Sequence, residues 1–548
     1  MSTAEKTSRI DLALQRMNAY SDWINPIVIK EVRQSLKSKL FVTTFMLSLA
    51  ACWAISVIGI MFFWNVIEYS PVSLQFFICY YWVLAFALFV VIPFGAFGSL
   101  QTERDQNTFE ILQITTLQPS QIVTGKLASA MLQAIILYAV IAPFIAFSSL
   151  LQGFDLLRVS YEMTISLAIC MGASMCCLML STLGKQKNFR TLMVLFLLGG
   201  LVSLFSSQAS FAAYVMAGGA DFDTEFYLWN LLFFLGGLSY FFLFHQITVA
   251  QLTFEAENRS FGIRVIATAQ FYLLWICMYA ISITYASTML RYSDDYAWSC
   301  AVISNFHWAI VGFFAVTEAE PLSRRIRRDL PKSFWKRWLM VSFLPGGSRG
   351  FFLVTKHLLL TIPLMLGLQY VTALAAGETN LPTLSGLLSE HKTQSSIAQI
   401  GYIIFFLGMG RLITAGMMKA APSTRPAHGR VVMLIMTLMC VLSPYLILWL
   451  VGYYENRMTL DYHPLMVINP VESLRYINDN DDAMSRLIFS FSVLAGGIVL
   501  LANLPGTLRG LRQGLWPQRP DPYRALDYST VREQLQRAEE TGVTAVMG

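Results

Sequence analysis

The stretch LFVTTFMLSLAACWAISVIGIMFFW, residues Leu40–Trp64, contains no charged side chain. An α-helix rises about 1.5 Å per residue, so about 20 apolar residues are enough to cross the hydrocarbon core of a bilayer, which is about 30 Å thick. We therefore predict that Leu40–Trp64 crosses a membrane as a single helix.

Apolar runs of similar length recur along the whole chain. It has 548 residues, of which 55% are hydrophobic and only 13% are charged, and its mean hydropathy is +0.55. This composition is typical of a polytopic membrane protein, and the alternating segments of about ten residues that build a transmembrane β-barrel are not seen. We predict an all-α fold with about twelve membrane-spanning helices. The predicted spans lie near 40–64, 74–100, 127–150, 161–183, 191–217, 227–250, 265–290, 298–317, 351–373, 397–418, 431–454 and 485–505.

The distribution of basic residues predicts the orientation. If the N-terminus lies in the cytoplasm, 33 of the 39 lysine and arginine residues fall in cytoplasmic segments and 6 fall outside. Cytoplasmic loops of membrane proteins carry such an excess of lysine and arginine. We therefore expect both termini in the cytoplasm, with residues 1–39 and 506–548 as the cytoplasmic ends and 101–126 as a cytoplasmic loop. We expect a multi-pass protein of the cell membrane, and specifically of a bacterial inner membrane.

An amphipathic stretch, NPIVIKEVRQSLKSKL, precedes the first span. Asn25 suits the N-cap of a helix and Pro26 suits its first position. The apolar positions recur every fourth residue, at Val28, Val32, Leu36 and Leu40. The other faces carry Lys30, Arg33, Gln34 and Lys37. We predict an interfacial helix with its apolar side in lipid, which serves either as a membrane anchor alone or as an elbow helix that also contacts a cytoplasmic partner.

The polar stretch TERDQNTFEILQITTLQPSQIVTGKL separates the second and third spans. Asn107 and Glu110 have the spacing of a capping box, and Pro119 interrupts the helix that they begin. The sequence predicts a short helix near 108–116, a turn, and then the start of the third span. An ordinary loop between two spans is the alternative reading of the same composition.

These two stretches resemble the permease subunit of ABC-2 type transporters. In that family an elbow helix precedes six spans, and the loop after the second span carries a pattern of the form E…GT-x-E-x-L…TPLS…GK. The matching positions are Glu103, Asn107-Thr108, Glu110, Leu112, Thr116-Leu117-Gln118-Pro119-Ser120 and Gly125-Lys126. Asn107 replaces the usual glycine, and Leu117-Gln118-Pro119 stands where the family has its proline and leucine. The resemblance is good over residues 23–150 and weaker to 250.

The resemblance implies that the short helix is a coupling helix, which docks into a separate cytoplasmic ATPase subunit. The chain would then be the transmembrane permease subunit of an ATP-driven exporter, with residues 40–250 as its six-span domain. The implied partner-coupling residues are Glu103, Asp105, Thr108, Glu110, Thr116, Pro119, Gly125 and Lys126. The implied elbow-helix residues are Asn25, Pro26, Lys30, Glu31 and Arg33.

No pattern in the chain predicts a nucleotide, metal or cofactor site. A phosphate-binding loop needs G-x-x-x-x-G-K-[ST], but Gly125-Lys126 is followed by Leu127 and has Ser120 where the first glycine is required. The eight cysteines form no C-x-x-C pair and the six histidines are scattered. We expect no enzymatic activity, no cofactor and no nucleic-acid partner, so ATP hydrolysis would belong to the ATPase subunit.

The second half of the chain, residues 251–505, holds six further predicted spans. Thr317-Glu318 follows the eighth span as Thr102-Glu103 follows the second, which is compatible with a diverged repeat and a pseudo-dimer of two six-span halves. A homodimer of the chain is the other arrangement considered. The basic run between 321 and 356 contains DLPKSFWKRWLMVSFL, which resembles an interfacial helix with aromatic anchors in contact with membrane lipid.

Other functions are compatible with a polytopic helical membrane protein. A secondary carrier driven by an ion gradient would need acidic residues or histidines in the centres of its spans, where charged residues are almost missing. A membrane-embedded enzyme would need clustered acids, histidines or arginines at one face. A membrane scaffold that does not transport is the remaining alternative.

Overall fold

The computed structural model is helical throughout its described part. The described residues are 26–67, 69–105, 118–151, 155–183, 187–254, 257–421, 423–451, 462–480 and 482–516. Twelve helices within these ranges are long and apolar enough to cross a membrane. The prediction of an all-α fold with about twelve helices of membrane-spanning length and composition is therefore confirmed.

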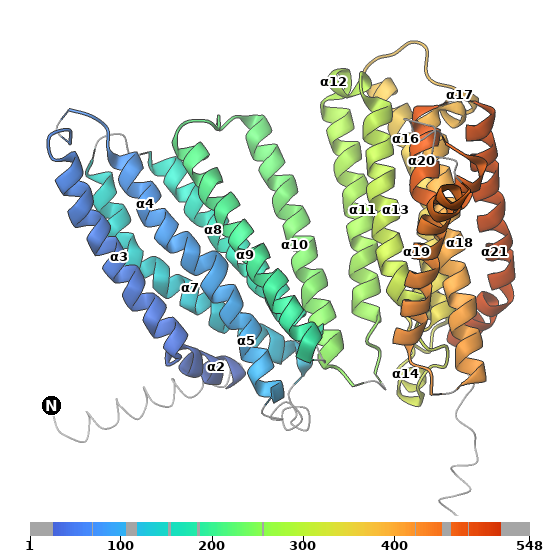
Figure 1. The fold of residues 1–548 in the computed structure, drawn as a ribbon, viewed down its shortest axis with the longest axis horizontal. Coiled ribbons are helices and arrows are strands. Elements are labelled where there is room, and N and C mark those ends of the chain that lie inside the picture. Colours follow the sequence, from blue (N-terminus) through green and yellow to red (C-terminus); the bar gives the residue numbers. More distant parts are fainter. Residues whose placement is uncertain are drawn as a thin grey trace, which may run out of the picture. The chain divides into compact units, whose positions relative to one another are not determined.

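The chain divides into two compact units. Unit 1 contains residues 1–254 and 265–270, and unit 2 contains residues 255–264 and 271–548. Each unit is a bundle of long helices, and each is described here by itself (Figure 1).

The described part of unit 1 begins with a short helix, which is followed by six long apolar helices. Its elements are α2 (Pro26–Leu36), α3 (Lys39–Phe63), α4 (Ser73–Phe86), the π-helical turn η1 (Ala87–Val91), α5 (Ile92–Asp105), α7 (Pro119–Ser149), α8 (Leu156–Leu183), α9 (Lys187–Met216) and α10 (Thr224–Leu252). The second span, α4–η1–α5, is the most buried of the six, and aromatic side chains such as Phe77 and Tyr81 fill the core around it.

Unit 2 also has six spans, with short helices between them. Its elements are α11 (Phe261–Thr284), α12 (Ala286–Leu290), α13 (Ser293–Ala315), α14 (Arg324–Arg328), α15 (Phe334–Met340), η2 (Val341–Phe343), α16 (Gly347–Ala375), α17 (Leu384–Ser389), α18 (His391–Ala420), α19 (Pro426–Leu450), η3 (Pro464–Ile468), α20 (Pro470–Asp479) and α21 (Ala483–Leu515). Within the unit, α12 and α17 lie at one end and α14 lies at the other (Figure 1).

The helices of the two units pack in a similar order. In unit 1 the second span contacts the third and fourth spans, and the fourth span, α8, contacts α9 and α10. In unit 2 the second span, α13, contacts α16 and α18, and the fourth span, α18, contacts α19 and α21. In both units the fourth span therefore joins one half of the bundle to the other.

Several helices extend beyond the predicted spans. The third begins at Pro119 instead of 127, and the last continues through Pro505 to Leu515 instead of ending at 505. A proline ends a helix less readily in a long apolar span, because neighbouring helices and polar side chains can satisfy the freed backbone groups.

Candidate functional site

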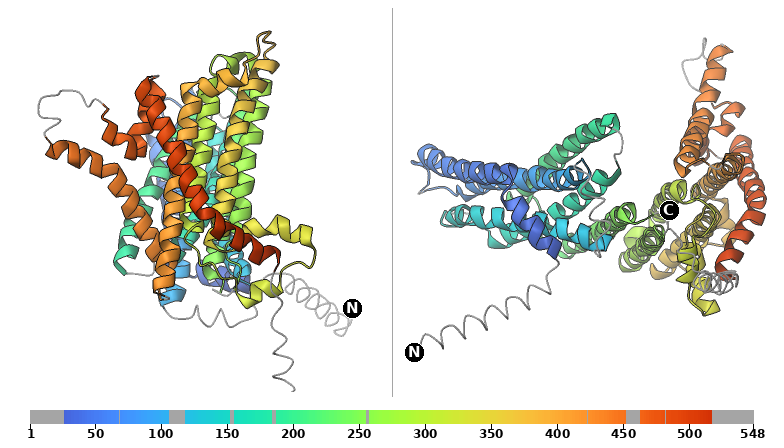
Figure 2. Two further views of the ribbon diagram at one scale, coloured as in Figure 1. Left: turned by 90° about the vertical axis from the view of Figure 1, so that its right-hand side faces the viewer. Right: turned by 90° about the horizontal axis from the view of Figure 1, so that it is seen from below.

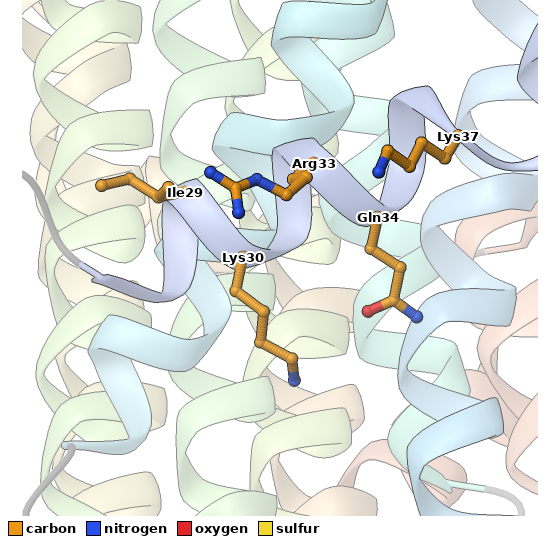
Figure 3. Close-up of a pocket in the computed structure, with 5 residues that line it drawn as sticks. All are labelled: Ile29, Lys30, Arg33, Gln34 and Lys37. Atoms are coloured by element: carbon orange, nitrogen blue, oxygen red, sulfur yellow. The ribbon is translucent and has the colours of Figure 1, made fainter.

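Helix α2 lies across the end of unit 1 where α5 ends and α7 begins (Figure 2, right). Ile27 and Glu31 are its buried side chains, and Val28, Val32 and Leu36 are half-buried. The predicted apolar stripe is therefore only part of the buried side. The exposed side forms a surface pocket (Figure 3). This pocket is lined by Ile29, Lys30, Arg33, Gln34 and Lys37.

A glycine lets α2 approach α7 closely. A Cβ atom placed at Gly125 would lie 2.6 Å from Cγ2 of Ile27, so no larger residue fits there unless Ile27 moves. The hydroxyl of Ser129 on α7 also donates a hydrogen bond of 2.8 Å to the hydroxyl of Ser35 on α2. The predicted lipid-facing helix therefore packs part of its apolar surface against protein.

Four charged side chains meet where α2, α5 and α7 come together, and we call them the unit 1 cluster. Nζ of Lys126 lies 3.2 Å from Oε2 of Glu31 and 3.1 Å from Oε2 of Glu103. Nζ of Lys30 lies 3.4 Å from Oε1 of Glu103 and 3.9 Å from Oε1 of Glu31. The Lys126 side chain is 3% exposed, the two carboxylates are 8% and 11% exposed, and Lys30 is 55% exposed.

Because the unit 1 cluster is buried, its ion pairs are important for the stability of the bundle. A buried charge is tolerated only when it is paired, and removing one partner of such a pair typically costs about 3–5 kcal/mol. Glu31 belongs to α2, Glu103 to the end of α5 and Lys126 to the second turn of α7. The cluster therefore joins the middle of α2 to the end of α5 and the start of α7, and the contact between Glu103 and Lys126 links the two helices on either side of residues 106–117.

The remaining predicted site residues have different positions. Pro119 is the first residue of α7, where Gln118 and Gln121 form a capping box, and Asp105 is the last residue of α5. Arg33 is exposed beside the α2 pocket, and Pro26 is the first residue of α2. The predicted residues that lie outside the described part of the chain are Asn25, Thr108, Glu110 and Thr116.

A second buried charge cluster lies at the start of α16, and we call it the unit 2 cluster. The guanidinium of Arg264 pairs with Glu318 at 2.7 Å. It also donates to the carbonyl oxygens of Ser342, Leu344 and Gly346 at 3.1, 2.5 and 3.2 Å. The backbone N–H of Gly346 donates to Glu318 at 2.9 Å. Arg264 thereby fixes the backbone that leads into α16.

Arg349 and Arg411 complete the unit 2 cluster. Arg349 is fully buried and donates to the carbonyl oxygens of Glu320 and Gly510 at 2.8 and 2.9 Å. The Glu320 carboxylate accepts from the N–H of Ser348 at 2.9 Å and pairs with Arg411 at 3.2 Å. The segment after α13 and the helices α16, α18 and α21 are therefore held together at one end of unit 2.

The sequence analysis did not predict this cluster. The available signal was Glu318 and Glu320 directly after a span, together with Arg349 at the start of the next one. The pairing of Glu318 with Arg264 and of Glu320 with Arg411 could not be predicted from the sequence, because the two arginines lie in other helices.

An acidic side chain within a span was also missed. Glu162 lies in α8 and is fully buried, and its Oε1 accepts a hydrogen bond of 2.7 Å from the hydroxyl of Tyr81. Among the described residues, its Oε2 has no hydrogen-bond partner. The predicted span 161–183 placed Glu162 at the membrane edge, whereas α8 begins at Leu156.

No family model matches the chain, and neither a curated protein nor a solved structure matches it. Within the described ranges, no group of three or more histidine, cysteine or acidic side chains is arranged to hold a metal ion. The features that bear on function are therefore the spans and the unit 1 cluster, whose residues Glu103 and Lys126 flank residues 106–117.

Proposed function

We propose that the chain is the transmembrane permease subunit of an ATP-driven exporter of the ABC-2 type, coupled to a separate ATPase subunit. The observation that carries this proposal is the unit 1 cluster. It joins the three segments that the resemblance assigns to coupling: the elbow helix, the end of the second span and the start of the third.

The unit 1 cluster would let a push on the loop 106–117 reach several helices at once. Glu103 precedes this loop, Lys126 follows it, and the two side chains are in contact at 3.1 Å. Because Lys126 also holds Glu31, a displacement of the loop is transmitted to α2, α5 and α7 together. Conformational coupling between two sites typically amounts to about 1–3 kcal/mol, which is less than the typical cost of breaking a buried ion pair.

The resemblance assigns both Glu103 and Glu110 to coupling, but only Glu103 lies within the described residues. Glu103 is buried and paired, so neutralising it changes the bundle itself. Glu110 lies in the loop outside the described residues and is the better probe of docking. Glu225, an exposed acid in the first turn of α10, is a matched control.

The test is co-purification of the chain with an ATPase subunit, followed by ATP turnover and transport in vesicles. We expect Glu110→Gln to lower ATP turnover several-fold without changing the unfolding temperature, and Glu225→Gln to change neither. If the chain transports its substrate without an ATPase, or if Glu110→Gln leaves turnover unchanged, the proposed coupling is wrong.

The buried Glu162 favours a second candidate, a carrier driven by an ion gradient. Ionisable residues inside spans commonly mark ion or proton pathways. This alternative predicts that an imposed ion gradient drives uptake or export by the chain alone, and that Glu162→Gln abolishes it. An ATP-dependent transport activity that survives Glu162→Gln would exclude this alternative.

A further inference from the structure

We propose that unit 2 carries a binding surface for anionic phospholipid headgroups, formed by residues 324–340 and Trp516. We call it the aromatic–basic platform. Residues 324–340 connect α13 to α16 and Trp516 directly follows α21, so the platform lies where three candidate spans end or begin. This inference does not depend on the proposed transport function.

The platform exposes large aromatic side chains. Trp335, Trp338 and Leu339 are 72%, 56% and 63% exposed, and α15 has no buried residue. Their spacing of three and four residues places them on one face of α15. Trp516, directly after α21, is 60% exposed, and its ring centroid lies 5.7 Å from the ring centroid of Phe334. Tryptophan side chains of this kind are enriched at membrane–water interfaces.

The platform is also strongly basic. Its only acidic residue is Asp329. Its basic residues are Arg324, Arg325, Arg327, Arg328, Lys332, Lys336 and Arg337. Two of them have carboxylate partners, since Arg325 pairs with Glu257 at 2.8 Å and Arg328 pairs with Asp329 at 3.4 Å. Clusters of lysine and arginine next to spans attract anionic lipids.

The platform is held in place on unit 2. Leu322, Ile326 and Leu344 form a small buried cluster beneath α14, and Leu330 packs against it. Helix α15, which has no buried residue, contacts η2 and α21. A bilayer surface satisfies both features, because aromatic rings enter the interface while the cations contact headgroup phosphates. A soluble protein partner is the competing occupant.

The test uses the full-length chain in detergent, with phosphatidylglycerol or phosphatidylcholine added, and native mass spectrometry to count bound lipids. We expect phosphatidylglycerol to bind more tightly than phosphatidylcholine. The double substitution K332Q/K336Q should weaken phosphatidylglycerol binding by about 25-fold, at roughly fivefold for each cation removed. The double substitution W335A/W338A should weaken the binding of both lipids.

The matched control is R291Q/R475Q, which removes the same charge from two exposed arginines outside the platform. It should leave lipid binding unchanged. Equal binding of the two lipids, or equal losses in the two charge variants, would overturn the proposal. It would also be overturned if K332Q/K336Q released a co-purified ATPase subunit while phosphatidylglycerol binding stayed intact, because the platform would then be a protein-docking surface.

Discussion

The two charge clusters join helices through different chemical groups. In the unit 1 cluster, the buried lysine lies between two buried carboxylates, and each of the three belongs to a different helix. In the unit 2 cluster, the arginines are buried, whereas Glu318 and Glu320 remain 24% and 35% exposed. Much of the hydrogen bonding by Arg264 and Arg349 goes to backbone carbonyl oxygens instead of carboxylates.

This difference has a mechanical meaning. A lysine is a compact point charge on a flexible stem, so Lys126 can keep contact with one carboxylate while a helix shifts. An arginine fork that holds several carbonyl groups fixes a particular backbone conformation. We propose that the unit 1 end adapts to movement whereas the unit 2 end is rigid.

The largest expected effect comes from Arg349→Met. This substitution leaves several buried carbonyl groups of three segments without a donor, each at a cost of about 1–3 kcal/mol, so we expect a loss of about 3–5 kcal/mol in the free energy of unfolding. Thermal unfolding of the purified wild-type and variant chains measures this loss of stability. Arg512→Met, an exposed arginine on α21, is the matched control and should change stability by less than about 0.5 kcal/mol.

A second test asks whether the stability lost by removing a cation from each cluster is restored when its carboxylate partners are also neutralised. Lys126→Met should cost about 3 kcal/mol, because two buried carboxylates lose their shared partner. The triple substitution K126M/E31Q/E103Q should recover most of this loss, since no buried charge is left uncompensated. Arg264→Met should not be rescued by Glu318→Gln, because the carbonyl groups of the loop remain unsatisfied. Equal rescue in both units, measured by chemical or thermal unfolding, would remove the distinction.

A third test compares two close helix contacts. A Cβ atom at Gly350 would lie 2.6 Å from the backbone oxygen of Ala315, whereas at Gly125 it would meet the side chain of Ile27. Backbone yields less readily than a side chain, so we expect Gly350→Ala to cost about 2 kcal/mol and Gly125→Ala about 1 kcal/mol. Unfolding midpoints of the two variants give the order, and a larger loss for Gly125→Ala would contradict it.

The smallest effect concerns the opposite end of unit 2. Burial, and then the neighbouring Asp294, raises the pKa of Glu390 above its ordinary value of 4.5. The native state then binds this proton more tightly than the unfolded state, so stability falls as pH rises from 4.5 to the raised pKa. We expect Glu390→Gln to be more stable than wild type at neutral pH and to lose that advantage below pH 4.5.

Unfolding midpoints across the pH range test this, with Glu378→Gln as the control at an exposed acid. An unchanged pH profile would show that the ionisation of Glu390 does not matter for stability.

The sequence predicted the spans well because the hydropathy of a long helix is a local property. It also singled out Glu31, Glu103 and Lys126, but as groups for an external partner. Their burial depends on how α2, α5 and α7 pack, and contacts between residues far apart in the chain cannot be read from local patterns. Glu162 was missed for a related reason, because the predicted start of its span was too late.

The π-helical turn η1 determines how the second half of the second span is rotated about its axis relative to the first half. Such a turn accommodates one extra residue in an α-helix, and it lies between the aromatic part of the span and Glu103. Converting this turn to regular α-helix without removing a residue would rotate the downstream part of the span, including Glu103, by roughly 100° about the helix axis. Glu103 would then point away from Lys126, so the angular position of this carboxylate is set about four turns earlier in the helix.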